Sequence, residues 1–328
     1  QGRIRRKHRH RGLPNACLCL GSCNRLREKE QVSVALGRVM ANKLLASIQL
    51  MRVKNLGLAL IATPLGAAFA LLDFEALRDY PEVALATLSV LFFMAAGNAL
   101  NDLSDVEIDK VAHPSRPLAN GSISISETKI LIGFLSLLSI ASLLGCLYMM
   151  EGSQAYTAGI YVAAIILMLT YDHGPRTKQK GLVGNIAISS LVAAVVLYGS
   201  SSIEGLDVLL CWYVAGVVFF VNLAREIIKD CQDMEADSES RQTLPMKIGK
   251  ENSRMVAYVL TLIGIVFFYI PSWQGACEFG HLFLQSPAIV LLMSLNGPMW
   301  KGEDYAVATR LRIAMLLGLV SFIVTILV

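Results

Sequence analysis

The sequence has few charged residues. Only 16% of its 328 residues are Asp, Glu, Lys or Arg, against 55% hydrophobic residues, whereas a soluble protein carries roughly 25% charged residues. This shortage excludes a large soluble domain, and the mean hydropathy of +0.55 points to a bilayer environment. We predict one integral, multi-pass membrane domain whose surroundings are the lipid bilayer, with no nucleic-acid partner.

The sequence also lacks paired cysteines, since none of its seven cysteines forms a CxxC pair. Cys17, Cys19 and Cys23 have no neighbouring His or Cys cluster at zinc spacing, which argues against a zinc site. The other four lie in or beside apolar segments, and we interpret them as small apolar residues: Cys146, Cys211, Cys231 and Cys277.

Acidic residues are absent from the first 27 residues, which contain eight Lys or Arg. An Arg-rich, acid-poor leader resembles an organelle transit peptide, although such peptides are also rich in Ser and this one is not. The alternative is a disordered basic tail on an anionic membrane face. We assign 1–43 to this leader and 44–328 to the transmembrane domain. A plastid or mitochondrial membrane is therefore one expected location.

Apolar segments follow one another along the rest of the chain, each close to the ~20 residues that a helix needs to cross ~30 Å of hydrocarbon. We predict an all-α bundle of about nine transmembrane helices, arranged as two four-helix repeats plus one. The segments are 56–72, 83–101, 130–150, 154–171, 182–200, 207–224, 255–271, 281–297 and 311–328.

The loops between these segments alternate in charge. Loops after spans two, four, six and eight hold nearly all the basic residues outside the leader region, whereas the loops on the other side hold only Arg78 and several acids. By the positive-inside rule, the even loops and the N-terminus face the cytoplasm, or the stroma or matrix of an organelle.

The first acidic stretch follows span two. Asn101, Asp105 and Asp109 are spaced by four, with Asp102 beside them and Arg116 further on. On a helix such residues share one face, and unpaired like charges at this spacing cost about 0.2–0.5 kcal/mol each. Near a bilayer the cost is larger. We therefore expect a cation against Asp105 and Asp109; the alternative is a solvated helix end.

The second acidic stretch ends span six on the same membrane side. Glu226, Asp230, Asp233 and Asp237 are spaced four, three and four, which again gives one helical face. Two acidic faces that meet across a cavity need divalent cations, and oxygen-only ligands indicate Mg²⁺. Because Mg²⁺ prefers few carboxylates plus substrate phosphates, the pattern predicts a diphosphate site above an apolar cavity.

Basic residues on the same side can neutralise the remaining phosphate charge. An isoprenoid diphosphate fits best, with its tail among the helices and Mg²⁺ stabilising the departing diphosphate while a hydrophobic acceptor attacks the allylic cation. The rival is a transporter or channel, but transporters place ionisable residues near the bilayer midplane, and here the acids lie at span ends. The basic residues are Arg116, Arg176, Lys178, Lys180, Arg225 and Lys229.

Both stretches resemble the two motifs of the UbiA superfamily of intramembrane prenyltransferases. The first reads Asn101-Asp102-x-x-Asp105-x-x-x-Asp109, followed by Arg116-Pro117-Leu118, and the second runs from Arg225-Glu226 through Asp237 to Thr243-Leu244-Pro245. The resemblance covers 44–328 and implies an all-helical fold whose active site opens at one membrane side. One departure is Arg241-Gln242, where members often show a Gly-Lys or similar pair.

The resemblance also implies roles for individual residues. It gives the Mg²⁺ ligands as Asn101, Asp105, Asp109, Asp233 and Asp237. It gives the catalytic residues as Asp105, Asp109, Asp233, Asp237 and Lys178. It gives the substrate contacts as Arg52, Asn55, Asn101, Asp102, Arg116, Tyr171, Asn185, Lys229 and Asp230. Asp172 and His173 are unusual at their positions, either as acid or base groups toward the acceptor or only as a helix cap.

The amino-acid sequences of 101–121 and 180–185 look most like the superfamily branch that makes archaeal-type ether lipids. In that branch a geranylgeranyl group goes to the hydroxyl of geranylgeranylglyceryl phosphate, and a phosphate-bearing acceptor would explain the surplus of basic residues. The alternatives are aromatic acceptors: a chlorophyllide, a homogentisate or a hydroxybenzoate. Those branches tend to open the first motif with Asn-Gln or to carry Arg-Thr before Arg-Pro, unlike this chain. The basic leader, in contrast, favours an aromatic acceptor in an organelle.

Overall fold

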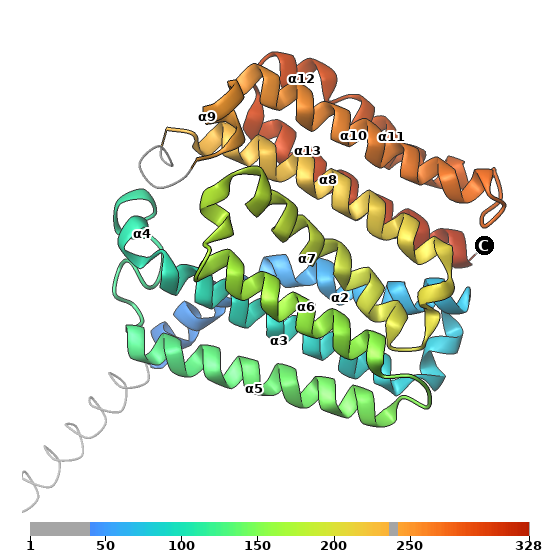
Figure 1. Cartoon of the computed structure of the whole chain (residues 1–328), viewed down its shortest axis with the longest axis horizontal. Coiled ribbons are helices and arrows are strands. Elements are labelled where there is room, and N and C mark those ends of the chain that lie inside the picture. Colours follow the sequence, from blue (N-terminus) through green and yellow to red (C-terminus); the bar gives the residue numbers. More distant parts are fainter. Residues whose placement is uncertain (1–39, 236–241, 328) are drawn as a thin grey trace, which may run out of the picture.

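The computed structural model describes residues 40–235 and 242–327, and every regular element within these ranges is helical (Figure 1). The predicted all-α fold is therefore confirmed. Residues 1–39 of the predicted leader and Asp237 lie outside the described residues, and the division at 43/44 stays a prediction. The first five elements after the helical segment Met40–Met51 are α2 (Val53–Leu71), η1 (Glu75–Asp79), α3 (Pro81–Ser104), α4 (Val106–Ala112) and α5 (Ile125–Met149).

The chain continues through ten further elements, and the acidic stretches lie on the second long helix of each predicted four-helix repeat, α3 and α8. These elements are α6 (Ala155–Asp172), η2 (Thr177–Lys180), α7 (Leu182–Ser201), η3 (Gly205–Asp207), α8 (Leu209–Asp233), α9 (Leu244–Ile248), α10 (Lys250–Trp273), α11 (His281–Met293), α12 (Asn296–Trp300) and α13 (Asp304–Leu327).

The number of spans agrees with the prediction of about nine. Eight helices in the described ranges are long and apolar enough to cross a membrane, counting α11 and α12 together as His281–Trp300. A ninth is reached when Met40–Met51 and Asn55–Leu71 form one span bent by 54°. The bend falls at Arg52, whose φ of 51° and ψ of 51° are left-handed. That conformation interrupts an α-helix because L-residues adopt it only at a cost.

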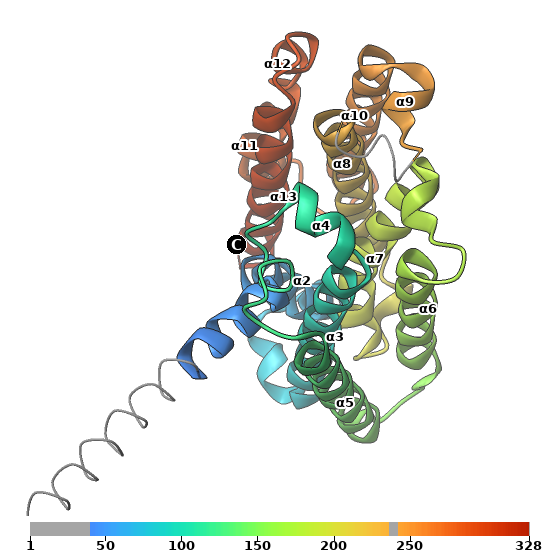
Figure 2. The same ribbon diagram turned by 90° about the vertical axis from the view of Figure 1, so that its left-hand side faces the viewer.

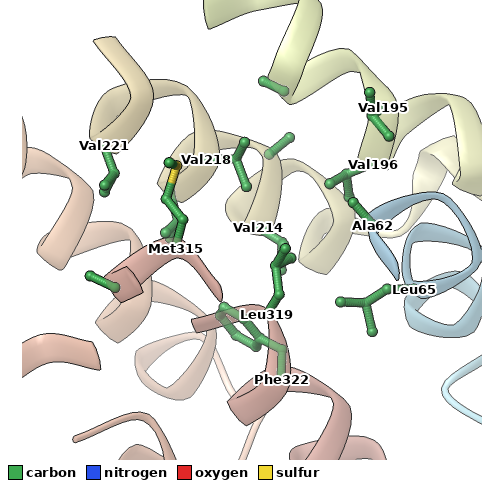
Figure 3. Packing of buried hydrophobic residues seen from close by; sticks show 14 of the residues in the cluster. Ala62, Leu65, Val195, Val196, Val214, Val218, Val221, Met315, Leu319 and Phe322 are labelled. Carbon is green, nitrogen blue, oxygen red and sulfur yellow. The ribbon is translucent and has the colours of Figure 1, made fainter. Parts of the chain in front are cut away.

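The long helices pack through close approaches of small residues, as membrane helices do. A Cβ at Gly199 on α7 would lie 1.8 Å from the Thr63 carbonyl oxygen on α2, and one at Gly66 would lie 2.0 Å from the Val196 carbonyl oxygen. The α2 and α7 backbones therefore touch. Around this contact, aliphatic and aromatic side chains from α2, α7, α8 and α13 fill the core (Figure 3).

Both acidic stretches lie at one end of the bundle. α4, which follows α3, and α9, which follows α8, lie toward the left end in Figure 1, and this end faces the viewer in Figure 2. The 73–80 connection, in cyan, lies at the opposite end in Figure 1. α3 joins the two ends and has 24 residues, or about 36 Å at 1.5 Å per residue. This arrangement matches the predicted placement of the acids; which end faces the cytoplasm stays a prediction.

Candidate active site

The first acidic stretch keeps its helical spacing but not a continuous helix. α3 ends at Ser104, and Asp105, with φ −104° and ψ 10°, separates it from α4. The stretch is therefore divided between two helices. Backbone bonds nevertheless run from Asp105 N to Asn101 O at 3.0 Å and from Asp109 N to Asp105 O at 2.8 Å. The three residues still follow one another by one turn, and both aspartates are buried.

The cations expected against these aspartates are present. Lys178 Nζ donates to Asp105 Oδ1 at 2.7 Å, and Arg116 Nη1 donates to Asp109 Oδ2 at 2.5 Å. Arg52 donates to the buried Asp102, which Arg116 also approaches at 3.5 Å. The alternative of a solvated helix end is wrong, because the carboxylates are buried and ion-paired. Arg52 owes its position to the left-handed turn that ends the first helical segment.

Asp172 joins this network, although the sequence left its role open. It is the last residue of α6 and accepts hydrogen bonds from Asn101 Nδ2 and from Lys178 Nζ, each at 2.9 Å. The neighbouring His173 is exposed, and its backbone N–H bonds to Leu169 O at 2.8 Å. The sequence signal was only the unusual Asp-His pair, and Asp172 is 71 residues from Asn101.

The ion pairs of this network join four carboxylates to three basic side chains. The carboxylates belong to Asp102, Asp105, Asp109 and Asp172, and the basic groups to Arg52, Arg116 and Lys178. These seven groups carry one more negative than positive charge when all are ionised. Excess charge of this kind in a buried place favours the binding of a further cation.

The second acidic stretch is helical as predicted up to Asp233, where α8 ends. Asn185 Nδ2 on α7 donates to Asp230 Oδ2 at 2.8 Å. Lys229 Nζ donates to Glu226 at 2.8 Å, as does Arg225 at 2.6 Å. Asp233 is exposed at the helix end.

The loop that carries Lys178 also contacts the chain beyond the second stretch. Gln242 N donates to Gln179 O at 3.0 Å. Gly181, with φ +58°, lies so close that a Cβ there would be 2.5 Å from Gln242 O. The η2 loop therefore reaches the first acidic network through Lys178 and the second half of the bundle through its backbone.

Three other residues singled out from the sequence lie next to members of this network along the chain. Asn55 is exposed beside Arg52, and Tyr171 is half-buried next to Asp172. Arg176 is exposed at the start of the η2 loop, with a left-handed φ of 44°. These positions leave the proposed substrate contacts as predictions.

Several polar atoms around the two stretches are buried without a hydrogen-bond partner in the part of the chain that the structure describes. Buried polar groups in folded proteins are normally paired, so such atoms call for a ligand or water. They include Ser104 Oγ, Thr177 Oγ1, Arg225 Nε, Gln232 Nε2 and Thr243 Oγ1. Thr177 belongs to η2, and Thr243 directly follows Gln242, which contacts η2.

The donor set fits Mg²⁺ in chemistry, because the predicted ligands offer only oxygen atoms. Among residues 40–235 and 242–327, no three His, Cys, Asp or Glu side chains form a group that could hold a metal ion. A cation here therefore needs further oxygens, which substrate phosphates supply in many Mg²⁺ sites.

The model of the UbiA prenyltransferase family matches residues 59–317. The chain belongs to the UbiA prenyltransferase family. It is therefore a prenyltransferase of the membrane, as its apolar helices indicate. Family membership also decides against the transporter interpretation.

Its relatives include archaeal synthases of one name. A digeranylgeranylglyceryl phosphate synthase of Pyrococcus horikoshii is 33% identical over 234 residues, which is 70% of this chain and 78% of that protein. One of Methanococcus aeolicus is 31% identical over 284 residues, or 84% of this chain and 96% of that protein. The predicted resemblance to the ether-lipid branch is thus confirmed.

Solved structures agree with the fold. One described as "Structural and mechanistic insights into the biosynthesis of Digeranylgeranylglyceryl phosphate synthase in membranes" has a TM-score of 0.69 at 28% identity, covering 87% of this chain and 98% of its own. A UbiA homolog from Archaeoglobus fulgidus, bound to GPP and Mg²⁺, has a TM-score of 0.61 at 18% identity, covering 86% and 100%. The second likeness shows the fold alone.

Proposed function

We propose that this UbiA-family enzyme transfers a geranylgeranyl group from its diphosphate to the hydroxyl of geranylgeranylglyceryl phosphate. The observation that carries the proposal is the buried network in which Lys178 and Arg116 neutralise Asp105 and Asp109 at the end of an apolar bundle. The name of the archaeal relatives supports the choice of acceptor.

The network is suited to exchange its partners when a diphosphate arrives. Lys178 and Arg116 each donate to a carboxylate now, and each can donate to a phosphate oxygen instead. That exchange frees Asp105 and Asp109 as oxygen ligands. Asn101, Asp105, Asp109 and Asp233 would then hold Mg²⁺, together with Asp237, which lies outside the described residues. When bound, the metal supplies charge stabilisation for the departing diphosphate.

The transfer breaks the bond between C1 of the donor and the diphosphate oxygen, and the electron pair leaves with the diphosphate. Lys178 and Arg116 can stabilise that charge by donating hydrogen bonds to it. The acceptor hydroxyl oxygen forms the new bond to C1, and its proton passes to the departing diphosphate. Because an allylic cation reacts with water, the apolar bundle below the network protects the reaction by excluding water.

The acceptor has a phosphate of its own, and the η2 loop offers basic residues for it. Arg176 and Lys180 are both exposed on this loop, within a few residues of Lys178. They would meet an acceptor phosphate at the membrane surface as charge-assisted donors. An aromatic acceptor without phosphate has no use for them. The organelle location gains no support, since the relatives reported above are archaeal.

Side-by-side turnover tests the acceptor. The purified protein is incubated in detergent with Mg²⁺, geranylgeranyl diphosphate and one of four acceptors, and the rate of product formation is measured. The acceptors are geranylgeranylglyceryl phosphate, chlorophyllide, homogentisate and hydroxybenzoate. We expect the fastest product to have the mass of the glycerol ether carrying two geranylgeranyl groups. An Arg176→Ala/Lys180→Ala variant should raise KM for that acceptor more than KM for the diphosphate. Faster reaction with any aromatic acceptor would overturn the acceptor and leave prenyl transfer intact.

A further inference from the structure

Lys178 lies between two buried carboxylates, and only one of them belongs to an acidic stretch. Its Nζ is 2.7 Å from Asp105 Oδ1 and 2.9 Å from Asp172 Oδ1. The side chains of Lys178 and Asp172 are 4% and 3% exposed. Lys178 is therefore removed from water and depends on these carboxylates for its counter-charge.

Asp172 contacts a second residue of the proposed site. The same oxygen, Oδ1, accepts a hydrogen bond from Asn101 Nδ2 at 2.9 Å. Asn101 lies on α3 and Lys178 on the η2 loop, so this carboxylate at the end of α6 ties together two elements that meet the substrate in the proposed function. A residue that serves only as a helix cap would bond to its own helix instead.

We propose that Asp172 is a positioning residue. It holds Lys178 and Asn101 in place, and it would keep Lys178 neutralised when Asp105 binds the metal of the diphosphate. The inference rests on the proposed function. It assigns Asp172 no contact with substrate.

The charge balance explains why a second carboxylate is useful. If Asp105 were the sole counter-ion of Lys178, a cation could recruit Asp105 only by leaving a buried ammonium group without a partner, which is costly. With Asp172 present, Lys178 keeps one carboxylate after Asp105 leaves. Asp172 thus makes Asp105 available to a cation, and it restrains Lys178 at a fixed place on the η2 loop.

The same geometry predicts opposite effects of Asp172 on Mg²⁺ binding and on metal-free anion binding. Because Lys178 Nζ touches both carboxylates, the two bonded oxygens lie within about 6 Å of each other. The charge of Asp172 therefore favours a cation at Asp105 and disfavours a bare anion there. Removing that charge should weaken Mg²⁺ binding and leave metal-free anion binding equal or stronger. Loss of mere structural support would weaken both.

The test compares Asp172→Asn with the wild-type enzyme. Asn keeps the shape of the side chain and an oxygen that can accept from Asn101 and Lys178. Two quantities are measured: the Mg²⁺ concentration for half-maximal turnover, and the calorimetric Kd of inorganic pyrophosphate in EDTA. We expect the Mg²⁺ midpoint to rise about tenfold or more, and the pyrophosphate Kd to stay equal or fall.

Two further variants sharpen the result. Glu107→Gln removes the same charge from a side chain that is exposed and pairs with Lys110, and it should change neither quantity. Asp172→Glu keeps the charge and should hold the Mg²⁺ midpoint within about threefold of wild type while lowering kcat. This variant also decides the matter if Asp172→Asn does not fold, since a tenfold rise with Glu would overturn the proposal.

The outcomes separate the two proposals. A wild-type enzyme whose turnover is indifferent to Mg²⁺ removes the proposed function, and this inference with it. A wild-type enzyme that needs Mg²⁺, together with an Asp172→Asn variant that leaves the midpoint unchanged, overturns the positioning role alone. So does an Asp172→Asn variant that weakens Mg²⁺ and pyrophosphate alike.

Discussion

Lys178→Met is the substitution whose cost follows most directly from the structure. Met has a similar length but no charge, so Asp105 and Asp172 lose the ammonium group 2.7 Å and 2.9 Å away. Removing one partner of a buried ion pair typically costs about 3–5 kcal/mol. The two carboxylates also repel across about 6 Å, which at an effective dielectric constant of about 20 amounts to roughly 3 kcal/mol if both stay ionised.

A loss of about 3–5 kcal/mol lowers the melting temperature of a protein this large by roughly 5–10 °C. With Cys17, Cys19 and Cys23 replaced by Ser, the assay can use a thiol-reactive dye in detergent, because the other four cysteines are buried and become accessible on unfolding. Asp172→Asn in the Lys178→Met background should recover part of the loss, since it removes one of the two carboxylates.

The control is Lys110→Met, which breaks the exposed pair with Glu107. Lys110 and Glu107 are 50% and 77% exposed, and exposed pairs contribute at most about 1 kcal/mol. Its melting temperature should stay close to that of the wild type. Lys178→Met that melts within about 2 °C of the wild type, or a double variant less stable than the single one, would refute the buried ion-pair network.

Three other predictions concern metal ligation, topology and packing. Asp105→Asn and Asp233→Asn should each leave a folded protein whose kcat is lower by about a hundredfold or more, since Lys178 keeps Asp172 in the first and the second is exposed. Cysteines placed at Glu107 and Asp79, both exposed, should label from opposite membrane sides. Gly199→Ala should destabilise the protein by about 1–3 kcal/mol or more, because its Cβ would lie 1.8 Å from a carbonyl oxygen of α2.

Each of these has its own control and contrary result. Near-normal turnover by either Asn variant at saturating Mg²⁺ would remove the shared metal site. Labelling of the cysteines at Glu107 and Asp79 from the same side would refute the span count. This experiment uses a background in which Cys17, Cys19 and Cys23 are replaced by Ser. Burial raises the pKa of the Cys277 thiol, which suppresses its labelling. Gly159→Ala, where a Cβ meets nothing within 4 Å, should leave the melting temperature unchanged or slightly higher, unlike Gly199→Ala.

Hydropathy alone predicted the long helices well, because lipid leaves the backbone few other options. The predicted span 182–200 is observed as Leu182–Ser201 and 154–171 as Ala155–Asp172. Spacing also predicted that Asp105 and Asp109 would need cations, since buried like charges are costly. The spacing did not reveal the break between α3 and α4 at Asp105. The acidic residues keep the separation of one helical turn across this break, as do the backbone hydrogen bonds.

Contacts between distant parts of the chain could not be predicted from the sequence. Asp172 reaches Asn101 across 71 residues, and Lys178 reaches Asp105 across 73. No local pattern encodes such pairs, so the sequence left Asp172 open between an acid or base group toward the acceptor and a helix cap. The contact of Gln242 with the η2 loop is equally long in range, and it depends on how the two halves pack rather than on either motif.

The most direct measurement follows labelled geranylgeranyl diphosphate with the purified protein and geranylgeranylglyceryl phosphate. With Mg²⁺, the label should move into the glycerol ether with release of one pyrophosphate per transfer. EDTA should stop the transfer, and added Mg²⁺ should restore it. Label that remains in the diphosphate with Mg²⁺ present, or transfer that continues at full rate in EDTA, would contradict prenyl transfer at the Asp105–Lys178 network.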